Sequence, residues 1–194
     1  MIKISNGIKK GFRLKVPNND LVRPKTSKIR KMIFDILHSV EQMEVLDIFA
    51  GSGSLGIEAL SMGAKFATFI DKSPTSINCI KDNLSKCNFT SQSIVVNKDF
   101  SAGTRLLIKN NKKYDLIFAD PPYSYFDDKT LNGIIRTALK LSSPGGIIVC
   151  EHPKEEKIVL DVKNRVKVYD AEASMPDVGL YISETVTHLR FAFE

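Results

Sequence analysis

Residues 46–60 read LDIFAGSGSLGIEAL, and this stretch decides the fold. A short apolar run leads into a turn with glycines at positions 51, 53 and 56, and a helix-like segment follows. A G-x-G-x-x-G turn between a strand and a helix is typical of folds that bind an adenosine-containing cofactor. Asp71 lies 20 residues after Gly51, where an acid that binds a ribose is expected. The turn alone fits either NAD or S-adenosylmethionine (SAM).

Two further features favour SAM. Asp47 places a carboxylate just before the glycine turn, where it would repel a pyrophosphate but suits the cationic amino-acid end of SAM. The second feature is the turn Asp120-Pro121-Pro122-Tyr123, which follows the strand-like run YDLIFA. A dehydrogenase has no need of such a turn.

The chemistry of this second turn suits a planar base with an exocyclic amine. Two consecutive prolines hold the chain extended beyond the sheet. The Asp120 carboxylate and the Pro121 carbonyl can accept the two amine hydrogens, while Tyr123 stacks on the ring. The nitrogen lone pair is then directed at a methyl sulfonium, and the carboxylate stabilises the developing positive charge. A rigid turn with a packing tyrosine is the alternative if the motif is taken by itself.

Strand-like and helix-like segments alternate along the chain and predict an α/β fold. We expect a Rossmann-like, mostly parallel seven-stranded sheet with helices on both faces, plus a small N-terminal β-hairpin over residues 1–17 with Asn6-Gly7 between its strands. The predicted strands are 45–50, 66–70, 93–97, 114–119, 146–151, 165–171 and 185–193. One predicted helix begins near Thr26, a second follows the glycine turn and ends near Met62, and a third begins at Pro74. Two further helices are predicted over 101–110 and 128–141. A loop with Pro176 and Gly179 separates the last two predicted strands.

The net charge of +6 over 194 residues is unevenly distributed. Residues 1–31 carry ten basic side chains and one acidic one, whereas the remaining residues carry 18 basic and 21 acidic ones. A basic end on a slightly acidic body predicts contact with a polyanion, although a solvated basic surface is the simpler alternative. The candidate phosphate-binding residues are Lys9, Lys10, Arg13, Lys15, Lys28 and Arg30, and charge alone does not distinguish RNA from DNA.

The composition excludes several classes of protein. A hydrophobic content of 43% and a charged content of 26% are typical of a globular domain, not of a fibrous or disordered chain. Three cysteines without a C-x-x-C pair and three scattered histidines predict no metal site and a reducing compartment. No apolar run is long enough for a membrane helix or a signal peptide, so we expect a cytoplasmic protein without membrane contact, and a monomer.

The pairing of the glycine turn with DPPY resembles the RsmD-type family of SAM-dependent methyltransferases, which modify the exocyclic N2 of a guanine in 16S ribosomal RNA. The similar stretches are VRPKTSKIRKMIFDIL (22–37), VLDIFAGSGSLGIEALSMGA (45–64), DLIFADPPY (115–123) and IIVCEH (147–152). The resemblance implies SAM as the cofactor and, as the partner, 16S rRNA in the small ribosomal subunit or its assembly intermediate. It also implies a basic extension over residues 1–22 and a methyltransferase domain over 23–194.

The resemblance assigns roles to individual residues. The implied cofactor-binding residues are Asp47, Phe49, Gly51, Ser52, Gly53, Asp71, Lys72, Asp99 and Phe100, with Arg23 and Thr26 at the edge of the pocket. The implied catalytic residues are Asp120, Pro121, Pro122 and Tyr123. Taken alone, Asp71 could be a helix cap and Asp99 could equally be one. Capping alone does not account for acids at the ends of successive strands at positions 47, 71, 99 and 120. Lys25 and Lys31 depart from the family pattern, which makes the first 31 residues more basic.

Other activities are compatible with the same motifs. DPPY is shared with DNA adenine-N6 methyltransferases, but the chain leaves no room for a separate domain that reads duplex DNA. A protein glutamine-N5 methyltransferase would more typically carry Asn at the position of Asp120. A non-catalytic RNA-binding module would have no affinity for SAM and would be indifferent to Asp120→Ala.

Overall fold

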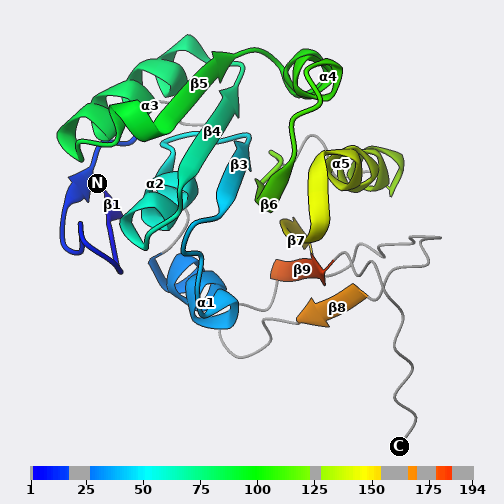
Figure 1. The fold of residues 1–194 in the computed structure, drawn as a ribbon, viewed down its shortest axis with the longest axis horizontal. Helices are drawn as coiled ribbons and strands as arrows, with labels where there is room; N and C mark the ends of the chain where they lie inside the picture. Colours follow the sequence, from blue (N-terminus) through cyan, green and yellow to red (C-terminus); the bar gives the residue numbers. More distant parts are fainter. Residues whose placement is uncertain (1, 18–26, 123–127, 154–165, 170–177, 185–194) are drawn as a thin grey trace, which may run out of the picture.

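The computed structural model describes residues 2–17, 27–122, 128–153, 166–169 and 178–184 (Figure 1). Its central sheet has the strand order β5-β4-β3-β6-β7-β9-β8. The five strands from β5 to β7 are parallel, and β9 and β8 continue the sheet in antiparallel pairing. The strands are β3 (Glu44–Ile48), β4 (Phe66–Asp71), β5 (Ser93–Asn97), β6 (Tyr114–Ala119), β7 (Ser142–Pro153), β8 (Val166–Tyr169) and β9 (Val178–Glu184). An α/β fold with a mostly parallel sheet is therefore confirmed.

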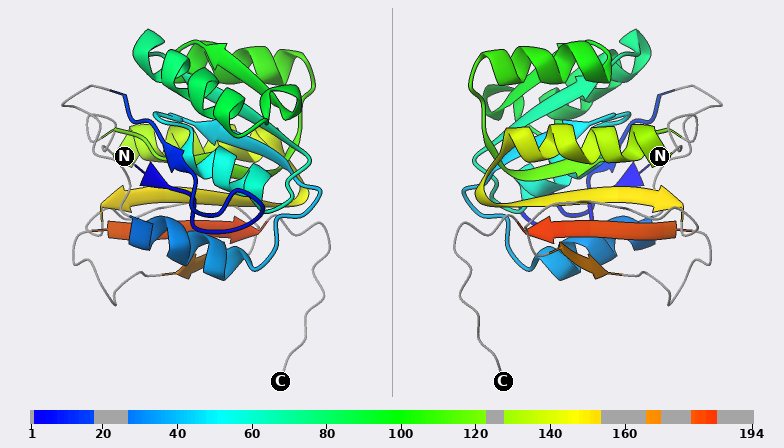
Figure 2. Two further views of the ribbon diagram at one scale, coloured as in Figure 1. Left: turned by 90° about the vertical axis from the view of Figure 1, so that its left-hand side faces the viewer. Right: turned by 90° about the vertical axis from the view of Figure 1, so that its right-hand side faces the viewer.

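Helices cover both faces of this sheet because its central strands are buried on both sides. The helices are α1 (Ser27–Leu37), α2 (Ser54–Ser61), α3 (Pro74–Lys86), α4 (Phe100–Lys109) and α5 (Asp128–Leu141). Val45 and Phe118 pack in a core with side chains from α1, α2 and α3, whereas Leu46 and Ile117 pack with side chains from α4 and α5. Figures 1 and 2 show the resulting layers.

The order of strands in the sheet changes direction between the neighbouring strands β3 and β6. Strands β3, β4 and β5 extend the sheet one way, and the chain then returns to place β6 on the other side of β3. In this pairing Ile48, the last residue of β3, lies opposite Ala119, the last residue of β6. Ligands of open α/β sheets bind beyond the strand ends at such a switch point.

The end of the sheet differs from the sequence-based prediction. Residues 178–184, which we predicted to be part of a loop, form strand β9, paired with β7 from Ile147–Glu184 to Pro153–Val178. The nearby Pro176 and Gly179 suggested a break, but pairing along a long neighbouring strand overrides such local signals. The predicted strand over 185–193 lies outside the described residues, as does the proposed domain boundary near residue 22.

The N-terminal segment packs against the main body. Strands β1 (Ile2–Lys3) and β2 (Arg13–Leu14) pair antiparallel, and Ile2, Ile4 and Leu14 are buried in the same core as α1 and α2. The connection between these strands spans residues 4–12, so Asn6-Gly7 lies between the two strands as predicted, within a connection longer than a two-residue turn. Figure 2 shows this segment running alongside α2.

Candidate active site

The two turns singled out in the sequence meet at the switch point. The glycine turn follows β3, Asp120 follows β6, and the Asp120 backbone N–H donates a long hydrogen bond of 3.5 Å to the Ile48 carbonyl. Asp120 is half-buried, Pro121 is buried and Pro122 is exposed. Tyr123 lies outside the described residues. A carboxylate and a fixed proline backbone therefore stand directly beside the glycine turn.

The glycine turn has an unusual backbone. Phe49, Gly51 and Gly53 all have positive φ angles, of 62°, 57° and 75°. This conformation is easy for glycine but uncommon for phenylalanine, and such backbone strain is often found at functional sites. Hydrogen bonds from Ala50 N–H to the Ile70 carbonyl (3.1 Å) and from Gly53 N–H to the Ala50 carbonyl (2.7 Å) fix the turn.

Asp47 belongs to β3, and its side chain reaches the N-terminus of α2. Its Oδ2 accepts a hydrogen bond of 3.0 Å from the backbone N–H of Gly56, and the residue is only 2% exposed. A helix N-terminus normally attracts anions. Here the protein's own carboxylate takes that place, so a pyrophosphate is disfavoured and a ligand with positive charge is favoured. This arrangement fits SAM and argues against NAD.

Asp71 closes the turn from the end of β4. Its Oδ2 accepts from the Gly51 N–H at 2.8 Å, and its Oδ1 accepts from the Ser73 N–H at 2.8 Å. The side chain is half-buried and each carboxylate oxygen retains a further lone pair, so it can still accept from ribose hydroxyls. Ser73, not Asp71, caps α3. Lys72 is exposed, and its carbonyl accepts from the Asn97 side chain at 3.1 Å.

Asp99 and Phe100 lie at the start of α4. The Asp99 carboxylate caps the helix by accepting from the Ala102 N–H at 2.9 Å, as the structural alternative predicted. The Phe100 ring stacks on the Phe49 ring, with centroids 5.4 Å apart and an interplanar angle of 20°. Both rings are half-buried, so an apolar platform joins the end of β3 to the end of β5.

Asn83 is a residue of this site that the sequence analysis missed. Its Nδ2 donates to the carbonyl of Ser52 at 3.0 Å, and Ser52 is itself buried in the glycine turn. The same carboxamide pairs with Lys15, donating to its carbonyl at 3.1 Å and accepting from its N–H at 2.8 Å. Asn83 is fully buried in α3, close to the buried side chains of Ile80 and Leu84. A polar residue on the apolar face of a predicted helix is the sequence feature from which its role could have been predicted.

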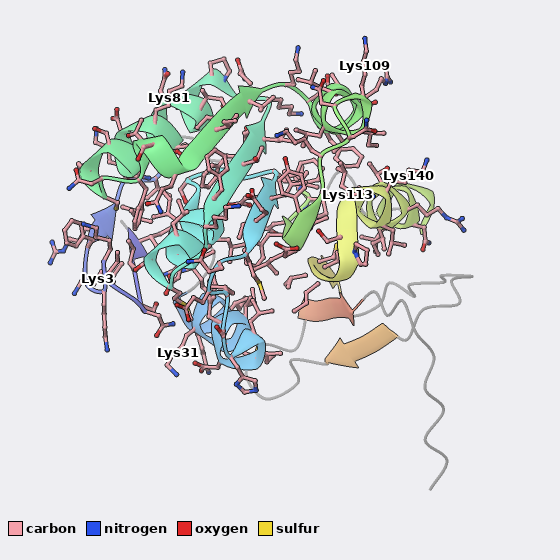
Figure 3. All side chains as sticks on the ribbon, in the orientation of Figure 1. Lys3, Lys31, Lys81, Lys109, Lys113 and Lys140 are labelled. Atoms are coloured by element: carbon pink, nitrogen blue, oxygen red, sulfur yellow. The ribbon has the colours of Figure 1, made fainter. Side chains whose placement is uncertain are left out.

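Most of the predicted RNA-binding residues lie on the surface. Lys10, Arg13 and Lys28 are exposed, and Lys9 is half-buried. Lys15 is exposed but pairs with Asp82 at 2.6 Å, and this hydrogen bond raises the pKa of the Lys15 ammonium. Figure 3 shows that exposed lysines also extend to the opposite side, where Lys109, Lys113 and Lys140 lie over α4, β6 and α5.

The prediction for Arg30 is wrong. Arg30 is fully buried, its Nε donates to Glu58 Oε2 at 2.7 Å, and its Nη2 donates to the Lys3 carbonyl at 2.6 Å. The guanidinium therefore holds α1, α2 and the N-terminal segment together and cannot contact RNA. The burial of Arg30 could have been predicted from the sequence. Arg30 precedes Ile33 and Phe34 by three and four residues, so it lies on the apolar face of α1.

The remaining predictions concern the edge of the cofactor pocket, metal binding and membrane contact. Arg23 and Thr26 lie outside the described residues. Within the part of the chain that the structure describes, no three histidine, cysteine or acidic side chains gather as a metal site. Within that same part, none of the helices combines the length and apolarity needed to cross a bilayer.

A mostly parallel sheet with a glycine turn after one strand and a DPPY turn after its neighbour defines the class of Rossmann-like SAM-dependent methyltransferases. Within this class the chain belongs to the RsmD family, since the family described as Conserved hypothetical protein 95 matches residues 2–181.

Individual relatives agree with this placement. The chain is 32% identical over 163 residues to Ribosomal RNA small subunit methyltransferase D of Buchnera aphidicola subsp. Acyrthosiphon pisum, with 82% of each protein covered. A hypothetical protein of Thermus thermophilus has a similar structure, with a TM-score of 0.75 and 28% identity over 95% of this chain and 99% of that one. A T. thermophilus 16S rRNA N2 methyltransferase in complex with AdoMet and guanosine shares the fold, with a TM-score of 0.68 and 17% identity over 88% of this chain and 45% of that one.

Proposed function

We propose that this protein transfers a methyl group from SAM to the exocyclic N2 amine of a guanine in 16S rRNA, in the small ribosomal subunit of the cytoplasm or its assembly intermediate. The observation that carries the proposal is the pairing of Ile48 with Ala119, which puts the glycine turn and the DPPY turn side by side at the switch point. The name of the Buchnera relative supports ribosomal RNA of the small subunit as the substrate.

The acidic groups around the glycine turn fit SAM. In the proposed complex Asp47 offers its negative charge to the cationic amino-acid end, and Asp71 accepts from the ribose hydroxyls. The backbone of Gly51, Ser52 and Gly53 lines the turn. The remaining proposed contacts to the cofactor are Phe49, Lys72, Asp99 and Phe100, with Arg23 and Thr26 at the pocket edge.

The chemistry at Asp120 follows from the position of its carboxylate. When bound, SAM supplies an electrophilic methyl group. The Asp120 carboxylate and the Pro121 carbonyl accept the amine hydrogens, Pro122 keeps the turn rigid, and Tyr123 stacks on the base. This arrangement directs the nitrogen lone pair toward the methyl group, and the fixed carboxylate stabilises the positive charge that develops on the nitrogen until one amine hydrogen leaves as a proton. The base must leave its stack to reach this site.

The exposed cations hold the RNA without selecting its sequence. Lys9, Lys10, Arg13, Lys15 and Lys28 are the proposed phosphate contacts. Lys15 must exchange its partner Asp82 for a phosphate, which costs little at an exposed site because surface ion pairs are weak.

The proposal is tested by incubating the protein and tritium-labelled SAM with naked 16S RNA, small subunits, duplex DNA or release factor. Label on guanine N2 of 16S RNA is the expected result. Label on adenine N6 or glutamine N5 would instead support one of the other two methyltransferase activities. Absence of label from every substrate, combined with no SAM binding, would support the RNA-binding module.

Asp120→Asn tests the catalytic role separately. The substitution keeps the shape of the side chain and removes its charge, so kcat should fall by about 100-fold or more. Asp35→Asn is the matched control, since Asp35 lies on the exposed side of α1 and forms an exposed ion pair with Lys31. An unchanged kcat for Asp120→Asn would contradict the role of this carboxylate.

A further inference from the structure

The hairpin tip, which we define as residues 7–12, exposes two large apolar side chains. Ile8 is 78% exposed and Phe12 is 45% exposed. Single exposed apolar residues are ordinary on protein surfaces. Here, however, the two lie on one short connection, among the cations Lys9, Lys10 and Arg13. Residues 2–17 contain five basic side chains and no acidic one.

The hairpin tip is held rigidly against the end of α2. The Ile8 N–H donates to the Ser61 carbonyl at 2.8 Å, and the Lys9 N–H donates to the Ser61 hydroxyl oxygen at 2.9 Å. The Ser61 hydroxyl in turn donates to the Asn6 carbonyl at 2.6 Å. Gly7 approaches so closely that an added Cβ would lie 1.9 Å from the Ser61 carbonyl oxygen. The exposed side chains are therefore presented by a fixed backbone.

The Phe12 ring is oriented by a cation. The Lys9 Nζ lies 5.3 Å from the centroid of the Phe12 ring and 5.9 Å from that of Phe89, which is buried. An ammonium over an aromatic ring is an attractive arrangement. An exposed aromatic ring next to cations combines the two groups with which proteins bind single-stranded nucleic acid, one for a base and one for its phosphates.

We propose that Phe12 stacks on an unpaired base of the RNA substrate, with Ile8 packing beside it and the neighbouring lysines on the phosphates. This proposal rests on the proposed function and adds a second point of contact. The hairpin tip binds the last residue of α2, while the glycine turn precedes its first residue, so the two are separated by roughly 12 Å along the helix at 1.5 Å per residue. The stacked base is therefore a nucleotide other than the target guanine.

The test compares variants in methyl transfer to small subunits and in binding of 16S RNA. Phe12→Ala should raise the KM for the RNA substrate by roughly 5- to 150-fold, the range expected for loss of one stacked base. The kcat and the Kd for SAM should stay within twofold of the wild-type values. Ile94→Ser is the matched control, because Ile94 is 50% exposed on β5 and lies outside the basic hairpin.

Two further variants separate stacking from general apolar contact. Phe12→Tyr keeps an aromatic face and should retain the wild-type KM, whereas Phe12→Leu should behave like Phe12→Ala. Equal KM values for the leucine variant and the wild type would overturn the stacking. A photo-crosslinker placed at position 12 should label RNA, and a crosslink to a ribosomal protein alone would show that the hairpin tip docks on protein instead.

Failure of the proposed function gives a different pattern. If wild-type protein methylates no RNA, that function is wrong, and the Kd of 16S RNA for Phe12→Ala still decides the role of the hairpin tip. An unchanged Kd and KM in a folded Phe12→Ala protein would overturn the inference. Thermal unfolding of each variant checks that it is folded.

Discussion

Arg30 and Glu58 form an ion pair that is almost completely shielded from water, with Arg30 Nε 2.7 Å from Glu58 Oε2 and side-chain exposures of 0% and 1%. The second oxygen of Glu58 accepts from the Ser5 N–H at 2.8 Å. One carboxylate thus joins two helices to the N-terminal segment. Such a pair stabilises a structure only while both partners are present, because each charge is costly to bury alone.

The first prediction concerns this pair. Arg30→Met should lower the free energy of unfolding by about 3–5 kcal/mol, since it leaves the Glu58 carboxylate buried without its partner. The double variant with Glu58→Leu should recover part of that loss. Lys31→Met is the control, because the Lys31–Asp35 pair is exposed and contributes only about 0.5 kcal/mol. Urea unfolding measures all three, and equal effects of Arg30→Met and Lys31→Met would contradict the argument.

The second prediction concerns the charge of Asp47. Asp47→Asn keeps an oxygen that can accept from the Gly56 N–H, so the protein should remain folded. Loss of the negative charge should weaken SAM binding by about 10- to 100-fold, the range for a hydrogen bond to a charged group. Isothermal titration calorimetry measures the Kd, with Asp35→Asn as the control. An unchanged Kd would show that Asp47 serves the turn only.

The third prediction concerns the fully buried carboxamide of Asn83. Asn83→Ala removes the hydrogen-bond partner of the Ser52 carbonyl and of the backbone N–H and carbonyl of Lys15, so the protein should lose about 3 kcal/mol of stability. The Lys15 amide should also exchange its hydrogen faster, as measured by NMR. Asn78→Ala is the control, since Asn78 is exposed on the same helix. An unchanged Lys15 exchange rate would mean that Asn83 does not hold the N-terminal segment.

The fourth prediction concerns the titration of Asp82. Its hydrogen bond from Lys15, together with the charge of Lys15, lowers the pKa of the Asp82 carboxyl. The stabilisation is therefore present above the ordinary pKa of an aspartate and is lost as the pH falls through the lowered value. The raised pKa of Lys15 places the corresponding loss at high pH, as the pH rises through that raised value.

Lys15→Met should return the pKa of Asp82 toward its ordinary value, which NMR titration of the carboxyl carbon measures. Lys81→Met, a neighbouring exposed lysine of α3, should move the pKa of Asp82 less. A larger effect from Lys81→Met would contradict the assignment of the shift to Lys15.

The fifth prediction concerns cysteine reactivity. Burial raises the pKa of the thiols of Cys79 and Cys87, and Cys150 is also buried. Because the thiolate is the reactive form, all three should react slowly with iodoacetamide at neutral pH and rapidly after unfolding. Ser85→Cys introduces an exposed thiol on α3 and should react at once in the folded protein. Rapid modification of the native thiols would contradict their burial.

Much of the fold was predictable because its signals are local. The apolar runs before the glycine turn and before DPPY correspond to β3 and β6 within one or two residues, and the helix after Thr26 corresponds to α1. Strand β9 was missed, because a strand stabilised by a distant partner carries no local pattern that outweighs a nearby proline and glycine. The order of strands, which brings Ile48 beside Ala119, is likewise a property of long-range pairing.

The positions of the acidic residues of the site could be predicted from the sequence, but their hydrogen-bond partners could not. The sequence placed Asp47 near the turn without indicating that it accepts from Gly56 at the start of a helix. Arg30 was misassigned because charge outweighed its position on the apolar face of α1. Asn83 was missed because its hydrogen-bond partners are 31 and 68 residues away in the chain.

Helix α2 sets how the protein tolerates changes in length. All eight of its residues are buried, and Gly53 and Ser61 at its two ends are each fixed by neighbours. One inserted residue would turn Ser61 by about 100° about the helix axis and advance it by about 1.5 Å. Its hydrogen bonds from the Ile8 and Lys9 N–H groups would then break. Residues 110–113, between α4 and β6, are exposed, and the hydrogen bonds described for them are local to α4 apart from that of the Lys113 ammonium to the Lys140 carbonyl at 2.7 Å. The protein should therefore tolerate a reporter peptide or purification tag inserted between residues 110 and 113, whereas an insertion of any length in α2 should disrupt the contacts at one end of that helix.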